Sequence, residues 1–387
     1  MTRSVADAPS TPWWAARTAS RPVSCRLPDF PWDKLAPLRA VATAHPDGLV
    51  DLSIGTPVDP TPGVLTAALA AAANRPGYPT TAGTPALRES AARWLARRFG
   101  VVALDPDAVL PAIGSKELIA ALPVHLGVGP GDAVVVPELA YPTYEVGARL
   151  AGADVVVADS TSALGPARPA LIWLNSPSNP TGRTLPAEHL AKVVSWARER
   201  GTLVASDECY LEYGWEGTAP VSVLHPSVSG GSLEGVLAVH SLSKRSNAAG
   251  YRCAFVAGDP GVVGELHAVR RNLGLMVPGP QQDAMRVALD DDEHVAEQRA
   301  RYARRREVLR EALQAAGFRI EHSQGSLYLW ASRDEPCWDS VAWLAERGVL
   351  VAPGDFYGRA GRRHVRVAFT ATDERVAAAA TRLTARP

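Results

Sequence analysis

Short apolar runs rich in Val, Leu and Ile recur through the middle of the chain. They cover residues 109–113, 133–137, 154–158, 171–175, 202–206, 237–241 and 253–257. Apolar runs of this length are typical of strands buried on both faces of a sheet. Segments of helical character, 115–127, 142–150 and 187–200, lie between several of them. This alternation predicts an α/β domain built on a mostly parallel seven-stranded sheet covered by helices.

The pattern changes after Asp259. A long charged segment, 292–316, is followed by shorter strand-like runs at 317–322, 326–331 and 364–369 and by a closing helix. We expect a second, smaller α+β domain here. Glutamates alternate with arginines in the charged segment, which predicts a solvated helix face. The arginines of that segment are Arg299, Arg301, Arg304, Arg305 and Arg306.

A length of 387 residues favours two domains. Residues 1–28, without a clear period around Trp13 and Trp14, are interpreted as an N-terminal extension. We place the N-terminal part of the small domain at 29–50 and the large domain at 51–265. Residues 266–387 then form inter-domain helices and the C-terminal part of the small domain.

Charge and cysteine usage narrow the class of protein. Lys+Arg number 40 and Asp+Glu number 40, so there is no net charge to attract nucleic acid or an anionic membrane. No signal-peptide core and no membrane-spanning apolar run is present in the sequence, which predicts a cytoplasmic protein. The four cysteines are widely scattered and read as structural thiols, and we expect no metal site.

Polar side chains follow several of the predicted strands. Lys244 comes directly after the run 237–241, and Ser241 and Arg252 near it could bind an anionic group. Ligands bind at this edge of open α/β sheets, although a lysine after a strand is also common as a solvated loop residue. Asp207 follows another predicted strand, where it could pair with a cationic ring nitrogen or serve as a helix cap or salt-bridge partner.

Two further segments have the same position relative to a strand. Asn179 lies in the turn Asn175–Gly182, which two prolines and a glycine stiffen, so that its amide has a fixed direction. Gly114 and Ser115 open a helix after a strand, which is typical of a phosphate cradle and also of a simple cap.

Together these motifs resemble the fold type I enzymes that depend on pyridoxal 5'-phosphate, in particular the class I/II aminotransferases of the aspartate aminotransferase fold. The match extends from Gly55 to Arg366 and so covers nearly all of the chain after its first 28 residues. The resemblance implies that Lys244 forms a Schiff base with the cofactor and moves the proton during a ping-pong transamination. It also implies that Asp207 faces the pyridine nitrogen and that Asn179 and Tyr210 bond the phenolic oxygen.

The resemblance assigns the remaining site residues as well. Those near the cofactor phosphate would be Gly114, Ser115, Lys116, Ser241, Ser243 and Arg252. Tyr141 would stack on the cofactor ring. Arg366 would hold the substrate α-carboxylate, assisted by Gly55 and Asn179. Tyr78 resembles the tyrosine that reaches the phosphate of a neighbouring subunit, which implies a homodimer.

Several stretches look like the actinobacterial succinyldiaminopimelate aminotransferases of lysine and diaminopimelate biosynthesis. They are residues 27–33, 77–89, 241–259 and 325–358. This resemblance implies glutamate and 2-oxoglutarate as one substrate pair and a second anchor for a distal carboxylate, with Lys116, Arg245 and Arg271 as candidates. The segment 277–282 departs from that pattern.

Three alternatives remain open from the sequence. The chain could transaminate another amino acid, or it could be a C–S β-lyase of the same fold. It could also be a cofactor-binding regulator, which we disfavour because about 28 residues before the domain cannot hold a winged-helix module.

Overall fold

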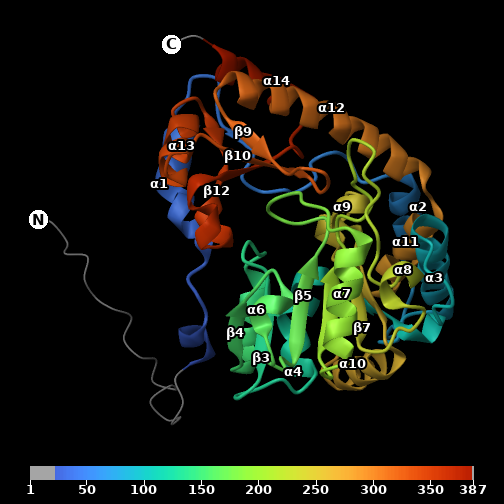
Figure 1. The fold of residues 1–387 in the computed structure, drawn as a ribbon. Helices are drawn as coiled ribbons and strands as arrows, with labels where there is room; N and C mark the ends of the chain where they lie inside the picture. Colours follow the sequence, from blue (N-terminus) through green and yellow to red (C-terminus); the bar gives the residue numbers. More distant parts are fainter. Residues whose placement is uncertain (1–21, 386–387) are drawn as a thin grey trace, which may run out of the picture.

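The computed structural model describes residues 22–385. Its centre is a seven-stranded sheet in the order β2-β8-β7-β6-β5-β3-β4 (Figure 1). The strands are β2 (Val109–Ala112), β3 (Ala133–Val136), β4 (Asp154–Val157), β5 (Leu171–Asn175), β6 (Leu203–Asp207), β7 (Val236–Ser241) and β8 (Ala254–Gly258). All seven predicted strands are present, and the predicted α/β class is confirmed.

One strand of this sheet runs against the others. β8 pairs antiparallel with both β7 and β2, while the other paired strands are parallel. Between β7 and β8 the chain makes only the short helix α9 (Leu242–Arg245) and one 3₁₀ turn (Ala249–Tyr251). This connection is too short for the crossover that a parallel neighbour needs, so the chain returns in the opposite direction.

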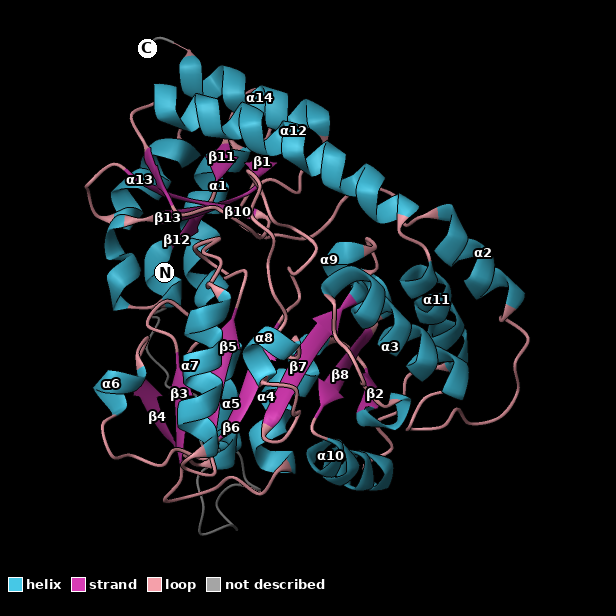
Figure 2. Ribbon diagram, turned by 45° about the vertical axis from the view of Figure 1, so that its right-hand side comes forward, coloured by secondary structure: helices cyan, strands magenta, loops and turns pink. Residues whose placement is uncertain are grey.

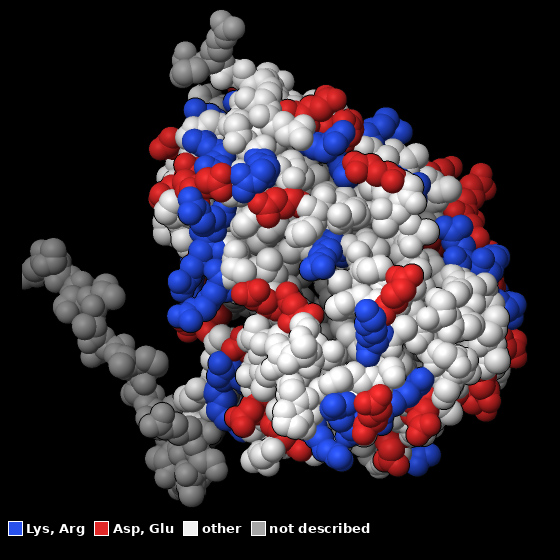
Figure 3. All heavy atoms as spheres, in the orientation of Figure 1, with Lys and Arg blue, Asp and Glu red and all other residues white. Residues whose placement is uncertain are grey.

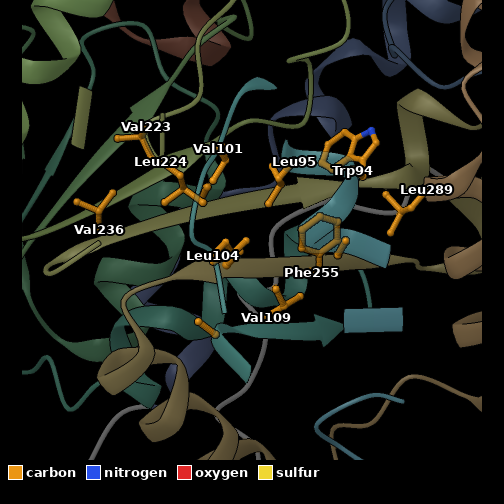
Figure 4. Close-up of a cluster of buried hydrophobic side chains, with 14 of the residues drawn as sticks. Trp94, Leu95, Val101, Leu104, Val109, Val223, Leu224, Val236, Phe255 and Leu289 are labelled. Carbon is orange, nitrogen blue, oxygen red and sulfur yellow. The ribbon is translucent and has the colours of Figure 1, made fainter. Parts of the chain in front are cut away.

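Alternate residues of the strands enter two apolar layers. Ile172 and Leu174 of β5 join the layer under α3 (Pro85–Phe99) and α7 (Ala187–Arg198). Figure 4 shows part of this layer, in which Trp94 lies beside Phe255. Leu171 and Trp173 face the other layer, under α4 (Ser115–His125), α5 (Thr143–Ala151) and α10 (Pro260–Asn272). Burial on both faces explains why these strands read as continuous apolar runs.

The smaller sheet has four antiparallel strands in the order β12-β13-β10-β9. They are β9 (Arg319–Glu321), β10 (Tyr328–Ser332), β12 (Ala352–Pro353) and β13 (Val365–Ala368). Beside them, β1 (Val50–Asp51) pairs in parallel with β11 (Val349–Leu350). A separate apolar cluster fills this part, with α13 (Cys337–Ala345) and α14 (Asp373–Thr384) packed over it. The domain boundaries given above stay a prediction.

Six further α-helices complete the described part of the chain. They are α1 (Ala36–Thr43), α2 (Gly63–Ala71), α6 (Thr161–Leu164), α8 (Pro226–Ser229), α11 (Gly279–Asp290) and α12 (Glu293–Ala315). Figure 2 shows α12 running from the smaller sheet, beside α14, to the neighbourhood of α2. Residues 23–26 of the predicted extension form one 3₁₀ turn, and residues 1–21 lie outside the described residues.

The expectation of a solvated α12 is wrong for two of its arginines. The side chains of Arg305 and Arg306 are buried. Arg305 forms an ion pair with Asp59 at 2.7 Å, and Arg306 forms one with Glu216 at 3.0 Å. The alternation of charges along a helix does not show whether an arginine contacts water or a carboxylate from a distant segment. Here Asp59 and Glu216 supply such carboxylates.

Charged side chains of both signs are interspersed over the visible face of the molecule (Figure 3). No helix within residues 22–385 is long and apolar enough to cross a membrane.

Candidate active site

Three neighbouring strands end together at the carboxyl edge of the large sheet. Asn175 ends β5 and is paired in register with Asp207, which ends β6, and Asp207 is in turn paired with Val239 of β7. The amide of Asn175 donates to the backbone oxygen of Asp207 at 2.9 Å. The sheet therefore brings together polar residues that are far apart in the sequence, at the edge where such sheets bind ligands.

Asp207 is a buried carboxylate, with 5% of its surface exposed. One oxygen accepts the hydroxyl of Tyr144 at 2.8 Å, and the other accepts the backbone N–H of Cys209 at 3.2 Å. Burial raises the pKa of Asp207. No ion-pair partner for it exists in the described part of the chain, so a cationic group on a ligand would complete its environment.

Lys244 follows the end of β7, in the short helix α9. The preceding Ser241 caps this helix by accepting the N–H of Ser243 at 3.1 Å. The lysine amine donates to the backbone oxygen of Gly55. Burial lowers the pKa of Lys244, so the amine loses its proton more easily than a lysine in water. A neutral amine is the nucleophilic form, which suits covalent attachment to an aldehyde.

The N-terminus of α4 is a candidate anion site. Gly114 caps this helix with a φ of +94°, and the guanidinium of Arg252 occupies the space where a side chain at residue 114 would be. The hydroxyl of Ser241 donates to the hydroxyl of Ser243 at 2.9 Å, and both serines precede Arg252 in the chain. Unpaired N–H groups of a helix N-terminus together with an arginine form a typical phosphate site.

Arg366, in β13 of the smaller sheet, is a buried cation with 3% of its surface exposed. It donates to the side-chain oxygen of Asn179 and to the backbone oxygen of Ser53, both at 2.7 Å. Both partners are neutral, and no carboxylate within residues 22–385 forms an ion pair with Arg366. A buried guanidinium held by neutral acceptors is suited to bind a carboxylate from a ligand.

Aromatic side chains surround these charges. Tyr141 contacts Tyr144 edge to face, with ring centroids 5.8 Å apart, and burial raises the pKa of Tyr141 to about 12. Tyr210, which follows β6, is buried and places its hydroxyl 2.8 Å from the hydroxyl of Tyr328. Burial also raises the pKa of Tyr210, so Tyr141 and Tyr210 stay protonated at neutral pH and can act as hydrogen-bond donors.

Sequence reasoning assigned no role to Tyr144 or Tyr328. Tyr144 lies three residues after Tyr141, and the turn that leads into α5, in which the N–H of Tyr144 donates to the backbone oxygen of Tyr141, brings the two rings into contact. This spacing was visible in the sequence. Tyr328 could not be found in this way, because its contact with Tyr210 joins strand β10 to the large sheet across 118 positions.

Four predicted residues lie apart from this cluster or have other partners. The ammonium of Lys116 lies over the ring of Phe30, 5.5 Å from its centre, so its side chain does not point to Arg252. Tyr78 is 96% exposed. Arg245 is buried and forms an ion pair with Glu212 at 3.2 Å. The prediction that it could anchor a distal carboxylate is wrong, because its charge is already paired. Arg271 is exposed in the last turn of α10.

A separate cavity of about 220 Å³, lined by both apolar and polar side chains, lies between the sheet and the helices α6 and α7. Val135, Leu174 and Val193 are among the residues that line it, and it shares Asn175 with the cluster described above. Neither Lys244 nor Arg366 lines this cavity.

Residues 47–383 match the family model of aminotransferase class I and II. A probable aminotransferase of Mycobacterium tuberculosis is 64% identical over 94% of this chain and 86% of its own length. The 4-dedimethylamino-4-oxo-anhydrotetracycline transaminase OxyQ of Streptomyces rimosus is 61% identical over 92% of this chain and 99% of its own.

Solved structures agree with these relatives. The N-succinyldiaminopimelate aminotransferase of Mycobacterium tuberculosis superposes with a TM-score of 0.81 at 29% identity, covering 91% of this chain and 96% of the other. The resemblance drawn from the sequence motifs is thereby confirmed at the level of the family.

Proposed function

The chain belongs to the class I and II aminotransferases, which depend on pyridoxal phosphate, and we propose that Lys244 holds this cofactor covalently while Arg366 binds the substrate carboxylate. One observation carries the proposal. The backbone oxygens of Ser53 and Gly55, two residues apart, accept from Arg366 and from Lys244 respectively. The amine of Lys244 and the guanidinium of Arg366 are thus held by the same short segment, where one α-amino acid could meet both.

The side chains of the cluster fit the cofactor. When bound, it supplies an electron sink for the bonds of the substrate Cα. Asp207 would balance the charge of its ring nitrogen, since the carboxylate is buried and has no cationic partner within residues 22–385. Tyr210 and Asn179 would donate to its phenolic oxygen, and Tyr141 would cover one face of its ring.

The anion site would hold the phosphate. Gly114 and Ser115 would contribute backbone N–H groups of α4, and Ser241, Ser243 and Arg252 would contribute side-chain donors. The lack of a side chain at Gly114 supports this assignment, because Arg252 fills that space. Lys116 would contribute through its backbone, since its ammonium lies over Phe30.

Lys244 would also move the proton. Because burial lowers the pKa of Lys244, its amine gives up its own proton more easily than a lysine in water. In the neutral form the amine can accept the proton from the substrate Cα and later return one as an acid. Arg366 would orient the substrate through two parallel hydrogen bonds to the α-carboxylate, so that the Cα–H bond faces the amine. The burial of both groups excludes water and strengthens these interactions.

For the substrate pair, we propose N-succinyl-LL-diaminopimelate with 2-oxoglutarate, and glutamate as the reverse donor. The structural likeness to an enzyme named for the first of these compounds supports this proposal. All of these compounds carry a second carboxylate beyond the one assigned to Arg366, so a further cationic or polar anchor would lie near the mouth of the site.

A second candidate is the amination of a ketone on a fused-ring compound. It is favoured by the 61% identity to a transaminase named for an oxo-anhydrotetracycline. In that case Arg366 would serve only the amino-acid donor, and the acceptor half-reaction would not need its guanidinium.

We also propose a homodimer in which Tyr78 reaches the phosphate site of the neighbouring subunit. The 96% exposure of Tyr78 supports this proposal, because its ring is accessible to a second copy of the chain. Sedimentation of the wild type and of Tyr78→Ala, with cofactor affinity measured for both, tests it. The cytoplasmic location stays a prediction.

Borohydride reduction followed by peptide mapping tests the attachment. We expect the cofactor label on Lys244, with no label after Lys244→Ala. A half-reaction panel then tests the substrate, using glutamate, N-succinyl-LL-diaminopimelate, aspartate and cystathionine with spectral detection. Conversion by the first two supports the proposed pair. Pyruvate release from cystathionine would instead indicate a C–S β-lyase, and label at another residue would overturn the role of Lys244.

A further inference from the structure

Tyr328 lies between the two parts of the proposed site and has so far no role. It begins strand β10, and only 2% of its surface is exposed. Its hydroxyl meets the hydroxyl of Tyr210 at 2.8 Å, and the guanidinium of Arg366 lies 4.1 Å from its ring centre. We propose that Tyr328 is a positioning residue whose ring orients Arg366 and whose hydroxyl keeps Tyr210 available as a donor to the cofactor, an inference that rests on the proposed function.

The register of the small sheet places the ring. Trp330 of β10 lies opposite Arg366 of β13, and Tyr328 lies two residues along β10, opposite Ala368. Tyr328 is therefore the diagonal neighbour of Arg366 on the same face, within reach of an aromatic ring. The ring covers one face of the guanidinium while Asn179 and Ser53 accept at its edge. Together these contacts fix the plane in which the arginine presents its remaining donors to a carboxylate.

The hydroxyl acts through Tyr210. A tyrosine hydroxyl has one proton to donate, so a hydrogen bond between two tyrosines uses the proton of only one of them. If Tyr210 donated to Tyr328, its proton would not be available to the cofactor. The proposed role of Tyr210 therefore requires that Tyr328 be the donor, and such a donor strengthens the hydrogen bond that Tyr210 makes in turn.

Gly55 holds the ring close to the reacting amine. A methyl group at residue 55 would overlap the ring of Tyr328, so this tyrosine packs directly on the peptide whose oxygen accepts from Lys244. The same ring thus contacts the guanidinium of Arg366 and the peptide that accepts from Lys244.

The test separates ring from hydroxyl in the holoenzyme. In Tyr328→Phe the ring stays and the hydroxyl is lost. A weaker donor at Tyr210 leaves more negative charge on the cofactor's phenolic oxygen. This charge favours a proton on the nearby nitrogen of Lys244. We expect the pH midpoint of the cofactor absorption change to rise by about half a unit or more. Binding of maleate, a dicarboxylate without an amino group, should be nearly unchanged.

In Tyr328→Leu the ring is lost as well, and we expect the dissociation constant of maleate to rise about tenfold. Tyr357→Phe is the matched control. The ring of Tyr357 also lies over Arg366, at 4.9 Å, but its buried hydroxyl has no hydrogen-bond partner within the described residues. Its absorption midpoint should equal that of the wild type.

Two results would overturn the inference. One is an absorption titration of Tyr328→Phe that coincides with the wild type, and the other is unchanged maleate affinity in a folded Tyr328→Leu. Should the leucine variant not fold, the phenylalanine variant still decides the part played by the hydroxyl. A wild-type chain that shows no cofactor absorption band would contradict the proposed function itself, before either variant is compared.

Discussion

The hydroxyl of Tyr144 donates to the carboxylate of Asp207 at 2.8 Å, inside the layer between α5 and the large sheet. This bond helps to keep a buried carboxylate charged, because burial alone raises its pKa and the hydroxyl opposes that effect. Asp207 must be charged to balance a cationic ring nitrogen.

We therefore expect Tyr144→Phe to weaken cofactor binding. A hydrogen bond to a charged group contributes about 2 kcal/mol, so the dissociation constant of pyridoxal phosphate should rise on the order of tenfold or more. Fluorescence titration of the apoprotein measures it. Tyr302→Phe, which changes a buried tyrosine of α12, should bind the cofactor as the wild type does. Equal affinities in the two variants would contradict the role of Tyr144.

The lack of a side chain at Gly114 gives a second prediction. In Gly114→Ala the new methyl group overlaps the guanidinium of Arg252, so the phosphate site is deformed. Affinity for pyridoxal phosphate should fall while affinity for pyridoxal, which has no phosphate, changes little. Gly127→Ala is the control, since Gly127 also has a positive φ but no atom lies within 4 Å of the added carbon. Both variants should lose about 1 kcal/mol of stability from backbone strain. Equal losses of affinity for pyridoxal phosphate and for pyridoxal would show that this site does not bind the phosphate.

Arg366→Lys tests the carboxylate fork. Lysine keeps the charge but lacks the planar pair of donors, so we expect the dissociation constant of glutamate to rise about a hundredfold. Cofactor affinity should be retained, because the proposed phosphate and ring contacts do not include Arg366. Arg362→Lys, at an exposed arginine of the same segment, serves as the control. Unchanged glutamate binding by Arg366→Lys would show that another residue holds the α-carboxylate.

The ion pair between Asp59 and Arg305 gives a prediction about stability. Burial would raise the pKa of Asp59, but hydrogen bonds from Arg305 and Gln298 outweigh it and lower the pKa. The folded state therefore prefers the charged carboxylate. The stabilisation that the charged Asp59 contributes is fully present above pH 3.8, the pKa of this carboxyl in the unfolded chain. It is lost as the pH falls through the lower pKa of the folded state.

Asp59→Asn should reduce the free energy of unfolding by about 2 kcal/mol at neutral pH, measured with urea. The difference from the wild type should shrink below pH 3.8. The control is Asp334→Asn, whose ion pair with Arg319 is exposed on both sides and contributes little. A difference that does not depend on pH would mean that packing, and not charge, accounts for the loss.

Much of this structure follows from the pattern of the sequence. The seven strands of the large sheet were predictable because burial on both faces leaves continuous apolar runs, and the residues at their ends were predictable because parallel strands share a carboxyl edge. Lys244, Asp207 and Asn179 were identified as candidates in this way. The reversal of β8 was not, since only the length of its connection to β7 indicates it.

The remaining omissions share a physical cause. Tyr328 and Arg305 act through partners from distant parts of the chain, Tyr210 in one case and Asp59 in the other. A tyrosine in a buried strand looks like core, and an arginine in a charged helix looks like surface. Neither assignment can be improved without knowing how the two sheets are placed against each other.

The short segment from Ser53 to Gly55 has a consequence for engineering. It leaves β1, which is paired with the small domain through β11, and it then accepts hydrogen bonds from both domains. A tilt of one sheet against the other would therefore shift both Arg366 and Lys244, the groups proposed to hold the substrate carboxylate and to move the Cα proton. Attempts to enlarge the range of accepted amines should therefore leave these three residues untouched and alter side chains at the mouth of the site.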